Sequence, residues 1–427
     1  MAALIMLVAL IALILINMPI AIALGVVAVS AIVLTDGFGA LLAMGVVMFE
    51  AATKFPLLAI PMFVLAGGIM NTTGISRRLI AFASAILGFI RGGLAMVNIA
   101  TSMFFAEISG SAVADVTAIG SILIPAMRQR GYPNTFAAAV TSSSASLAII
   151  IPPSIPMILY AVIADTSVIQ MFIAGVVPGI IGAAGLMGLS YWFARRRGYP
   201  VEEVFQLSHV WHTFKEAAWA FLLPIIILGG IFGGVVTATE GAGLAVVAAI
   251  FIGGVIYREL TWAQLARSMV EGAIQTSVVV LLIVTSALLG LYLTQTRLPH
   301  ELANWVISVT DNQILVLAMF NVLFIVLGFF LHGAAAIILV VPIVMPIVHQ
   351  LGIDPVHFGL IVTLNLAIGQ QTPPVASVLI VTCSIAKADV WAVTKTNVYF
   401  IGVLLAVLML VTYVPAIPLF LVEAFYR

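Results

Sequence analysis

Two stretches of this chain place a pair of prolines beside small polar side chains, in segments that are otherwise apolar. The first stretch has Thr, Ser and Ala at 141–146 ahead of Pro152 and Pro153; the second has polar residues at 363–372 ahead of Pro373 and Pro374. Proline cannot continue a helix or donate a backbone hydrogen bond, so each pair frees carbonyls. Carbonyl, hydroxyl and amide oxygens suit a hard cation, whereas transition metals favour histidine and carboxylate clusters. We therefore expect a Na⁺ site at each pair, and restarting half-helices whose N-terminal ends suit a carboxylate.

The two stretches are copies of one pattern in register. Each member of the second copy lies 221 residues after its counterpart: Gly131 and Gly352, Pro125 and Pro346, and the two proline pairs. Matched, interrupted apolar segments in two halves are typical of the binding site of a secondary transporter. For residues 141–146 alone, close packing of small residues, with serines bonded to their own helix, is an equal alternative. That alternative does not explain the repeated proline pairs.

Composition restricts the class of protein. Apolar residues make up 63% of the 427 and charged residues 7%, with no net charge. This composition predicts an all-α polytopic membrane protein in a lipid bilayer, and no basic run suggests a nucleic-acid partner. Cys383 is the only cysteine, which excludes an internal disulfide and a cysteine metal site. The apolar segment at 2–16 lacks a basic start and a cleavage site, and we expect it to be a retained first helix.

Both halves divide into the same parts, which we expect to be inverted repeats. The first repeat, residues 1–200, has expected spans at 2–16, 20–34, 56–70 and 168–193, a lateral helix at 38–53, a helix at 77–90, a hairpin at 93–127 and a broken helix at 134–164. The second, residues 219–427, has spans at 220–236, 242–256, 274–293 and 398–419, a lateral helix near 262–270, a hairpin at 313–348 and a broken helix at 356–386. Breaks in a membrane helix persist only where they line a cavity or bind something.

Basic residues predict the orientation. Arg195, Arg196 and Arg197 indicate a cytoplasmic loop, and counting back places Arg91 and Arg130 on the same side. Residues 93–127 then enter and leave on one side, as a re-entrant hairpin. In the second half the charge bias reverses, because residues 349–354 have no Lys or Arg. Five crossings per half produce this inversion, giving ten spans, two hairpins entering from opposite faces, and both termini outside.

Acidic and histidine residues near the hairpin tips have two possible roles. Glu107 and Asp115 flank the first tip, and a carboxylate at the centre of a membrane helix costs about 2.5–3.5 kcal/mol, so each needs a partner or a purpose. A structural role is as well supported as cation binding. His332 lies at the second tip without a counterpart in the first, where it either packs or carries a proton. Glu240 is expected in a solvated turn.

With these residues assembled, the chain resembles the large membrane subunit (DctM-like, M subunit) of tripartite ATP-independent periplasmic (TRAP) transporters. The resemblance covers essentially the whole chain. It is carried by EISGSAVADVTAIGSILIPAM from Glu107, IIIPPSIPMILY from Ile149 and NLAIGQQTPPVAS from Asn365. One departure is Ala376, where a glycine is expected.

The resemblance implies an elevator-type transporter in the bacterial inner (cytoplasmic) membrane, driven by sodium and not an enzyme. It implies three partners: a small four-helix membrane subunit, a periplasmic substrate-binding protein, and an organic acid of the C4-dicarboxylate or sialic acid type. The implied substrate contacts are Ser109, Gly110, Ser111 and Ser154. The implied sodium ligands are Ser143, Ser144, Gly333, Asn365, Gly369, Gln370 and Thr372.

Three other functions agree less well with the sequence. A stand-alone cation-coupled carboxylate symporter without partner subunits is the main alternative, although the short first spans favour an accessory subunit that covers them. An intramembrane enzyme would need a nucleophile with a base or metal ligands, and neither a His-Asp-Ser grouping nor HExxH spacing occurs. A passive channel does not explain repeated broken helices. The sequence therefore favours a sodium-coupled carrier.

Overall fold

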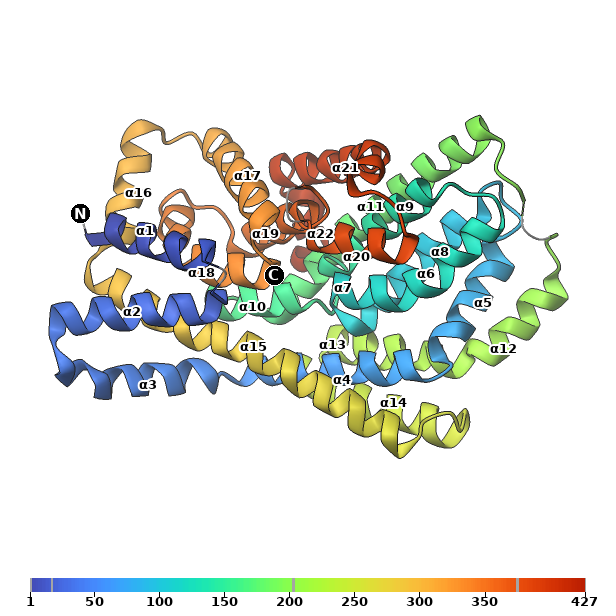
Figure 1. The fold of residues 1–427 in the computed structure, drawn as a ribbon, viewed down its shortest axis with the longest axis horizontal. Coiled ribbons are helices and arrows are strands. Elements are labelled where there is room, and N and C mark those ends of the chain that lie inside the picture. Colours follow the sequence, from blue (N-terminus) through green and yellow to red (C-terminus); the bar gives the residue numbers. More distant parts are fainter. Residues whose placement is uncertain (1, 17, 202–203, 374–375, 427) are drawn as a thin grey trace.

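The computed structural model describes residues 2–16, 18–201, 204–373 and 376–426, and throughout these ranges the regular structure is helical (Figure 1). The first half contains α1 (Ala2–Leu15), α2 (Ile20–Asp36), η1 (Phe38–Ala40), α3 (Leu41–Ala52), η2 (Phe55–Leu58), α4 (Ala59–Thr72), α5 (Ile75–Leu87), α6 (Gly93–Ser109), α7 (Ala112–Asp115), η3 (Val116–Gly120), α8 (Ser121–Gln129), α9 (Asn134–Ala145), η4 (Ser146–Ile149), α10 (Ile155–Ile163) and α11 (Val168–Arg197). The second contains α12 (Leu207–Pro224), η5 (Ile225–Gly229), α13 (Gly230–Phe232), α14 (Ala238–Phe251), η6 (Ile252–Ile256), α15 (Trp262–Gln295), α16 (Leu298–Val309), α17 (Gln313–Phe330), α18 (Gly333–Gln350), α19 (Pro355–Gly369), α20 (Ser377–Ala386), α21 (Val390–Tyr413) and α22 (Ala416–Tyr426).

The expected parts are present. A first hairpin is formed by α6 to α8 and a second by α17 and α18. Two helices are broken: the first break, residues 150–154, separates η4 from α10, and the second break, residues 370–376, separates α19 from α20. The prediction of an all-α membrane fold with two hairpins and two broken helices is confirmed. Pro374 lies outside the described residues.

One prediction for the second half is wrong. The lateral helix near 262–270 and the span at 274–293 form a single helix of 34 residues, α15. In the first half the same stretch is divided, because the chain leaves α3 at Thr53 and restarts with Pro56 near the N-terminus of η2. The counterpart of Pro56 is Ser277, which has an N–H to donate, so the helix continues.

Two other predicted spans have different bounds. The span expected at 220–236 begins earlier, within a continuous helical segment from Leu207 to Phe232. The span expected at 398–419 is interrupted, because α21 ends at Tyr413 and α22 begins at Ala416. Pro415 lies between them, and proline disfavours helical geometry in the residue before it.

The two broken helices run antiparallel. At one end of the pair, the Asn134 side chain at the start of α9 donates to the carbonyl of Ala386 at the end of α20, at 3.0 Å. At the other end, the Tyr160 hydroxyl of α10 donates to the carbonyl of Pro355 at the start of α19, at 2.7 Å. Each contact joins the end of one broken helix to the start of the other. The two halves are therefore inverted with respect to each other.

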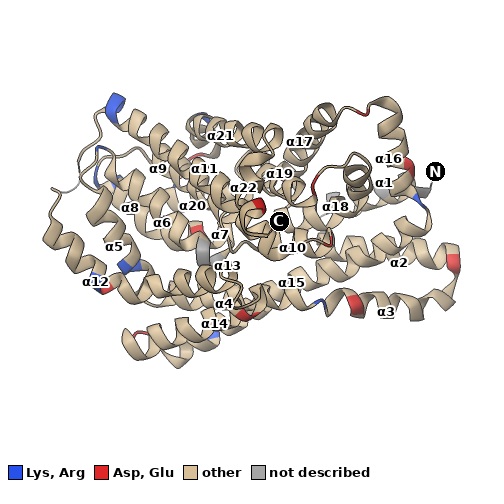
Figure 2. Cartoon of the chain, turned by 180° about the vertical axis from the view of Figure 1, so that it is seen from behind, with Lys and Arg blue, Asp and Glu red and all other residues tan. Residues whose placement is uncertain are grey.

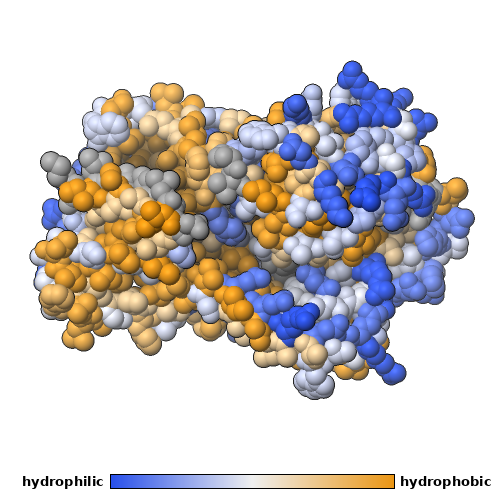
Figure 3. Space-filling model, in the orientation of Figure 1, coloured by the Kyte–Doolittle hydropathy of each residue, from blue (hydrophilic) through white to orange (hydrophobic). Residues whose placement is uncertain are grey.

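Length and composition agree with a membrane protein. Eight helical segments within the described ranges are long and apolar enough to cross a bilayer. Six of them overlap predicted spans and two are the arms of the second hairpin. In Figure 3 apolar residues dominate the half of the visible face where α1, α2 and α3 lie, and hydrophilic residues gather at the opposite end, where α5, α8 and α12 lie. Figure 2 shows Lys and Arg concentrated at the same end, and the positive-inside rule predicts that this end faces the cytoplasm. The total of ten crossings stays a prediction.

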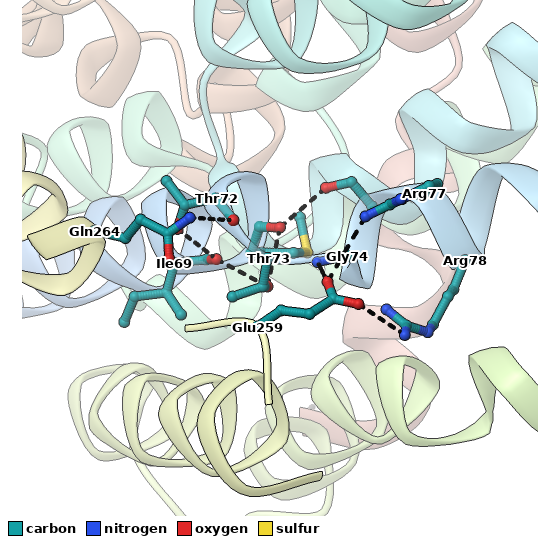
Figure 4. A network of polar contacts seen from close by, with 10 residues as sticks. Ile69, Thr72, Thr73, Gly74, Arg77, Arg78, Glu259 and Gln264 are labelled. Atoms are coloured by element: carbon teal, nitrogen blue, oxygen red, sulfur yellow. Dashed lines mark hydrogen bonds and ion pairs between the residues drawn. The ribbon is translucent and has the colours of Figure 1, made fainter. Parts of the chain in front are cut away.

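A layer that we call the scaffold, helices α2, α3, α4, α14 and α15, lies along one edge of the molecule (Figure 1). Within it α15 packs against α2, α3 and α4, and α14 packs against α4, so that the two repeats interlock. A polar clamp reinforces this layer outside the spans (Figure 4). The Glu259 carboxylate accepts hydrogen bonds from the Gly74 N–H and, at 2.9 Å, from Arg78, while Gln264 donates to the carbonyl of Thr72 at 3.2 Å.

Candidate functional site

The tip of the first hairpin rests on the first break. Gly110 has a φ of +58°, and its carbonyl accepts a hydrogen bond from the N–H of Ile155 at 3.4 Å. A Cβ on Gly110 would lie 2.9 Å from the carbonyl oxygen of Pro153, so only glycine fits both the conformation and the space. Ser111 follows as the N-cap of α7. The predicted tip and the predicted break are thus one contiguous structure.

The second hairpin meets the second break in the same way. A Cβ on Gly333 would lie 2.8 Å from the amide nitrogen of Gln370. The backbones of Gly328 and Gly369 are closer still, since a Cβ on Gly369 would lie 2.5 Å from the Cα of Gly328. The Gln370 side chain is 3% exposed. Gly333, Gly369 and Gln370, which the sequence placed in one sodium group, are therefore neighbours in space.

A buried amide and hydroxyl network joins the first hairpin to the first broken helix. Asn98 of α6 donates to the Thr141 hydroxyl at 2.7 Å, and its carbonyl oxygen accepts from the Ser144 hydroxyl at 3.0 Å. Ser102 donates to Ser144 at 3.0 Å. All four side chains are at most 1% exposed. Ser144 thus has hairpin partners that position its oxygen.

The second half has a matching network. Asn365, the counterpart of Ser144, donates to the side-chain oxygen of Asn321 in α17 at 2.7 Å, and Asn321 donates to the Thr412 hydroxyl at 3.2 Å. In each repeat, the first part of the broken helix is therefore hydrogen-bonded to an asparagine on the first arm of its hairpin. Asn98 and Asn321 were missed at the sequence level; an amide within an apolar helical segment is the signal that could have identified them.

Ser143 lies against the opposite repeat. Its hydroxyl is 2.8 Å from the amide oxygen of Gln371, at the second break, and 2.9 Å from that of Asn397 in α21. Asn397 also donates to the main-chain carbonyl of Gln371 at 3.1 Å. All three side chains are fully buried. The sequence grouped Ser143 with Ser144 at the first break, whereas the structure places it with Gln371 and Asn397. Gln371 belongs to the polar residues that were expected at the second break, and Asn397 was not predicted.

Two predicted hydroxyls bond to their own segment. Ser154 caps α10 and donates to the carbonyl of Ile149 across the first break, at 2.7 Å. Thr372 donates to the carbonyl of Ile368, at 2.8 Å. Both hydroxyl oxygens keep lone pairs for a further ligand. The side chains of Glu107 and Ser109 lie outside the described residues, and Asp115 is buried at the end of α7.

The donor set fits an alkali cation and an organic anion. Its atoms are hydroxyl, amide and carbonyl oxygens, and no group of three or more His, Cys, Asp or Glu that could hold a metal occurs in the part of the chain that is described. Neutral oxygens suit Na⁺ better than a transition metal. The start of α10 adds backbone N–H groups and a positive dipole end beside the first tip. Inverted halves, broken helices and convergent polar groups define a secondary transporter.

Comparison with known proteins identifies the family. The family model described as "Tripartite ATP-independent periplasmic transporter, DctM component" matches residues 7–417. The C4-dicarboxylate TRAP transporter large permease protein DctM of Pseudomonas aeruginosa is 38% identical over 87% of both chains. The sialic acid large permease protein SiaM of Vibrio cholerae is 36% identical over 96% of both. The chain belongs to the DctM component family and is a multi-pass protein of the inner membrane.

The chain also matches a longer relative and a solved structure. The isethionate TRAP transporter permease protein DctMQ of Oleidesulfovibrio alaskensis is 41% identical over 95% of this chain, which spans 64% of that longer relative. The crystal structure of the Alcanivorax borkumensis YdaH transporter, described as having an unusual topology, matches with a TM-score of 0.64 over 88% of each chain at 15% identity. The latter supports the fold alone.

Proposed function

We propose that this chain is the large permease subunit of a tripartite transporter that takes up a small organic acid together with Na⁺. A periplasmic binding protein delivers the acid, and a small four-helix membrane subunit covers part of the scaffold. The contact of each hairpin tip with its own helix break supports the proposal most directly. It brings neutral oxygens and a helix N-terminus together at the centre of an inverted repeat.

The substrate class follows from the relatives and from the site. Relatives are named for isethionate, C4-dicarboxylates and sialic acid, which are all organic anions. Within the described residues the hairpin tips and breaks offer hydroxyls, amides and backbone N–H groups. These neutral donors bind an anion although no Lys or Arg lies at the described tips and breaks. The relative named DctMQ is longer than this chain, which is consistent with a partner subunit fused to it.

In the proposed elevator movement, the hairpins and broken helices slide as one body against the scaffold. The buried networks of Ser144 and Asn365 hold each hairpin to its broken helix during such a movement. A bound cation would fix the break carbonyls, and the acid would then bind between the tips. The binding of Na⁺ and of the acid is thereby coupled to one movement, the sliding of the hairpins and broken helices against the scaffold.

A melting experiment tests sodium binding without a known substrate. The purified protein is compared in NaCl and KCl at equal ionic strength, for the wild type and for Thr372→Ala and Ser144→Ala. A ligand at 100 times its Kd adds about 2.7 kcal/mol to the stability. The matched control is Thr382→Ala, whose buried hydroxyl bonds only to its own helix. A Na⁺-specific shift that Thr372→Ala or Ser144→Ala reduces supports the proposal; equal melting in both salts counts against sodium coupling.

Uptake into proteoliposomes separates the proposal from its alternative. Tripartite transport requires the binding protein and the small subunit, and it is abolished when either is left out. A stand-alone cation-coupled carboxylate symporter would transport at the same rate without them. Isethionate, a C4-dicarboxylate and a sialic acid are the substrates to test first, because they are the acids named for the relatives.

A further inference from the structure

The two hairpins contact the rest of the molecule through different arms. The first hairpin packs on α4 and α5 through its first arm, α6. The second hairpin packs on the equivalent helices, α15 and α16, through its second arm, α18. A molecule with true two-fold symmetry would use the same arm in both halves. The repeats share one sequence pattern, so this difference is one of conformation.

Burial of equivalent residues shows the same asymmetry. In the second half the Ser286 hydroxyl of α15 donates to the carbonyl of Ile338 at 2.8 Å, and the Ile338 side chain is 2% exposed. Their counterparts, 221 residues earlier, are Leu65 and Thr117. Thr117 is exposed, and its hydroxyl bonds to Val113 of its own hairpin. The second arm of the second hairpin thus contacts the scaffold at Ile338, whereas the equivalent residue of the first hairpin, Thr117, makes no such hydrogen bond.

Among the described residues, a second scaffold contact is found only in the first half. Lys54, in the gap between α3 and η2, extends its ammonium group to the carbonyl of Val162 in the last turn of α10, at 3.1 Å. A cation at a helix C-terminus satisfies an orphan carbonyl and the negative end of the dipole. The counterparts of Lys54 and Val162 are Gln275 and Cys383. Gln275 is exposed on α15, while Cys383 is buried in α20, which packs mainly on α9, α21 and the first hairpin.

We propose that the protein has a second conformation in which the two repeats exchange these arrangements. In it, Gln275 reaches the last turn of α20 at Cys383, and Lys54 leaves Val162. Thr117 becomes buried on the scaffold near Leu65, and Ile338 loses its contact with Ser286. The proposal rests on the elevator movement of the proposed function, and it assigns the residue contacts that distinguish the two end states.

The exchange is unequal in energy. In the present state Lys54 donates a charge-assisted hydrogen bond to the carbonyl of Val162. In the proposed second state the equivalent bond comes from the neutral amide of Gln275. Charge-assisted bonds are roughly twice as strong as neutral ones. Lys54 therefore biases the equilibrium towards the present state, and Lys54→Gln should raise the population of the second state about two- to tenfold.

Cysteine cross-linking tests the exchange, because Cys383 is the only native cysteine. Gln275→Cys is treated in proteoliposomes with a flexible bifunctional thiol reagent, and the joined peptides are measured by mass spectrometry. Gln275→Cys in a Cys383→Ser background is the negative control. Met269→Cys is the position control, because Met269 is exposed on the same helix six residues earlier, about 9 Å away. A second protein, which carries Lys54→Cys and Val162→Cys in the Cys383→Ser background, reports the present state. Its two cysteines cross-link when residues 54 and 162 are in contact, as they are in this structure.

We expect both pairs to cross-link, each in a fraction of the molecules. Lys54→Gln should raise the yield of the product that joins position 275 to Cys383 about two- to tenfold, while Lys54→Arg leaves it unchanged. Absence of that product in protein that transports an acid would overturn the exchange and leave the proposed function standing. A product as abundant from Met269→Cys would also overturn it. Cross-linking at Gln275→Cys in protein that transports none of the acids would support the exchange and count against the proposed function.

Discussion

The hydroxyl of Ser146 donates to the carbonyl of Ala367 at 3.3 Å, and these two residues occupy equivalent positions of the two repeats, 221 residues apart. A residue can touch its own counterpart only near the axis that relates the halves. Both breaks begin within a few residues of this pair. The two helix breaks therefore lie on either side of one centre.

The tip of the first hairpin provides the first prediction. Gly110→Ala forces a left-handed conformation, at a cost of about 1–2 kcal/mol, and also drives a Cβ against the Pro153 carbonyl. We expect a lower melting temperature and loss of the Na⁺-specific shift. Gly131→Ala is the matched control, because Gly131 has a φ of +85° with nothing within 4 Å of its added Cβ. Equal effects of the two substitutions would show that the contact between tip and break is unimportant.

The network between the repeats provides the second prediction. Asn397→Ala removes the donor to the Gln371 carbonyl and one acceptor near Ser143, in a fully buried environment. Leaving buried polar groups unpaired costs about 1–3 kcal/mol. We also expect a higher half-saturating Na⁺ concentration for uptake, because the second break loses a support.

Thr394→Ala is the control for Asn397→Ala. Thr394 lies one turn earlier on α21, and its hydroxyl bonds only to Val390 of its own helix. Stability is measured by chemical denaturation and uptake by initial rates against Na⁺ concentration. A loss of stability with an unchanged Na⁺ dependence would assign Asn397 a purely structural role.

Much of the fold could be predicted from the sequence, because proline pairs, apolar lengths and the 221-residue offset are local properties. The offset even aligns helix ends, since α8 ends at Gln129 and α18 at Gln350, and α9 begins at Asn134 and α19 at Pro355. The continuity of α15 was missed because the lateral helix was transferred from the first half, although Ser277 had replaced Pro56.

The site was harder to predict than the fold. Ser143 and Ser144 are adjacent in sequence, yet Ser144 bonds within its own repeat and Ser143 to the opposite one. Successive residues of a helix face different directions, and only the packing of α21 and the second break decides what each one meets. The carbonyls at the breaks could be predicted from the prolines, whereas the asparagines that support them are distant in sequence.

The clamp outside the spans provides a pH prediction. The hydrogen bond from Arg78 is the main cause that holds the pKa of the Glu259 carboxyl below its ordinary value, with smaller help from the Arg78 charge, the Gly74 N–H and Arg77, while burial acts in the opposite direction. A lowered pKa means that the folded state binds the proton less tightly than the unfolded state. Its stabilisation is therefore full above the ordinary pKa and is lost as the pH falls through the lowered one.

We accordingly expect the melting temperature of the wild type to fall more steeply than that of Glu259→Gln as the pH falls from about 5, just above the ordinary pKa of a glutamate, to about 3. The control is Glu271→Gln, since Glu271 is exposed on α15. Parallel melting curves for wild type and Glu259→Gln across this range would show that the clamp contributes nothing through its charge. Ionic strength is held constant, because the carboxylate is partly exposed and salt screens it.

The divided and undivided forms of the scaffold helix provide the last prediction. Ser277→Pro copies Pro56 into the middle of α15, where it removes a backbone hydrogen bond and clashes with the preceding turn, at a cost of about 3 kcal/mol or more. The converse change, Pro56→Ser, is expected to be far milder, because Pro56 lies at a helix start that already lacks a donor partner. Melting temperature and yield of folded protein measure both. If Ser277→Pro were tolerated as well as Pro56→Ser, α15 would not need to be continuous, and the scaffold could bend equally in both halves.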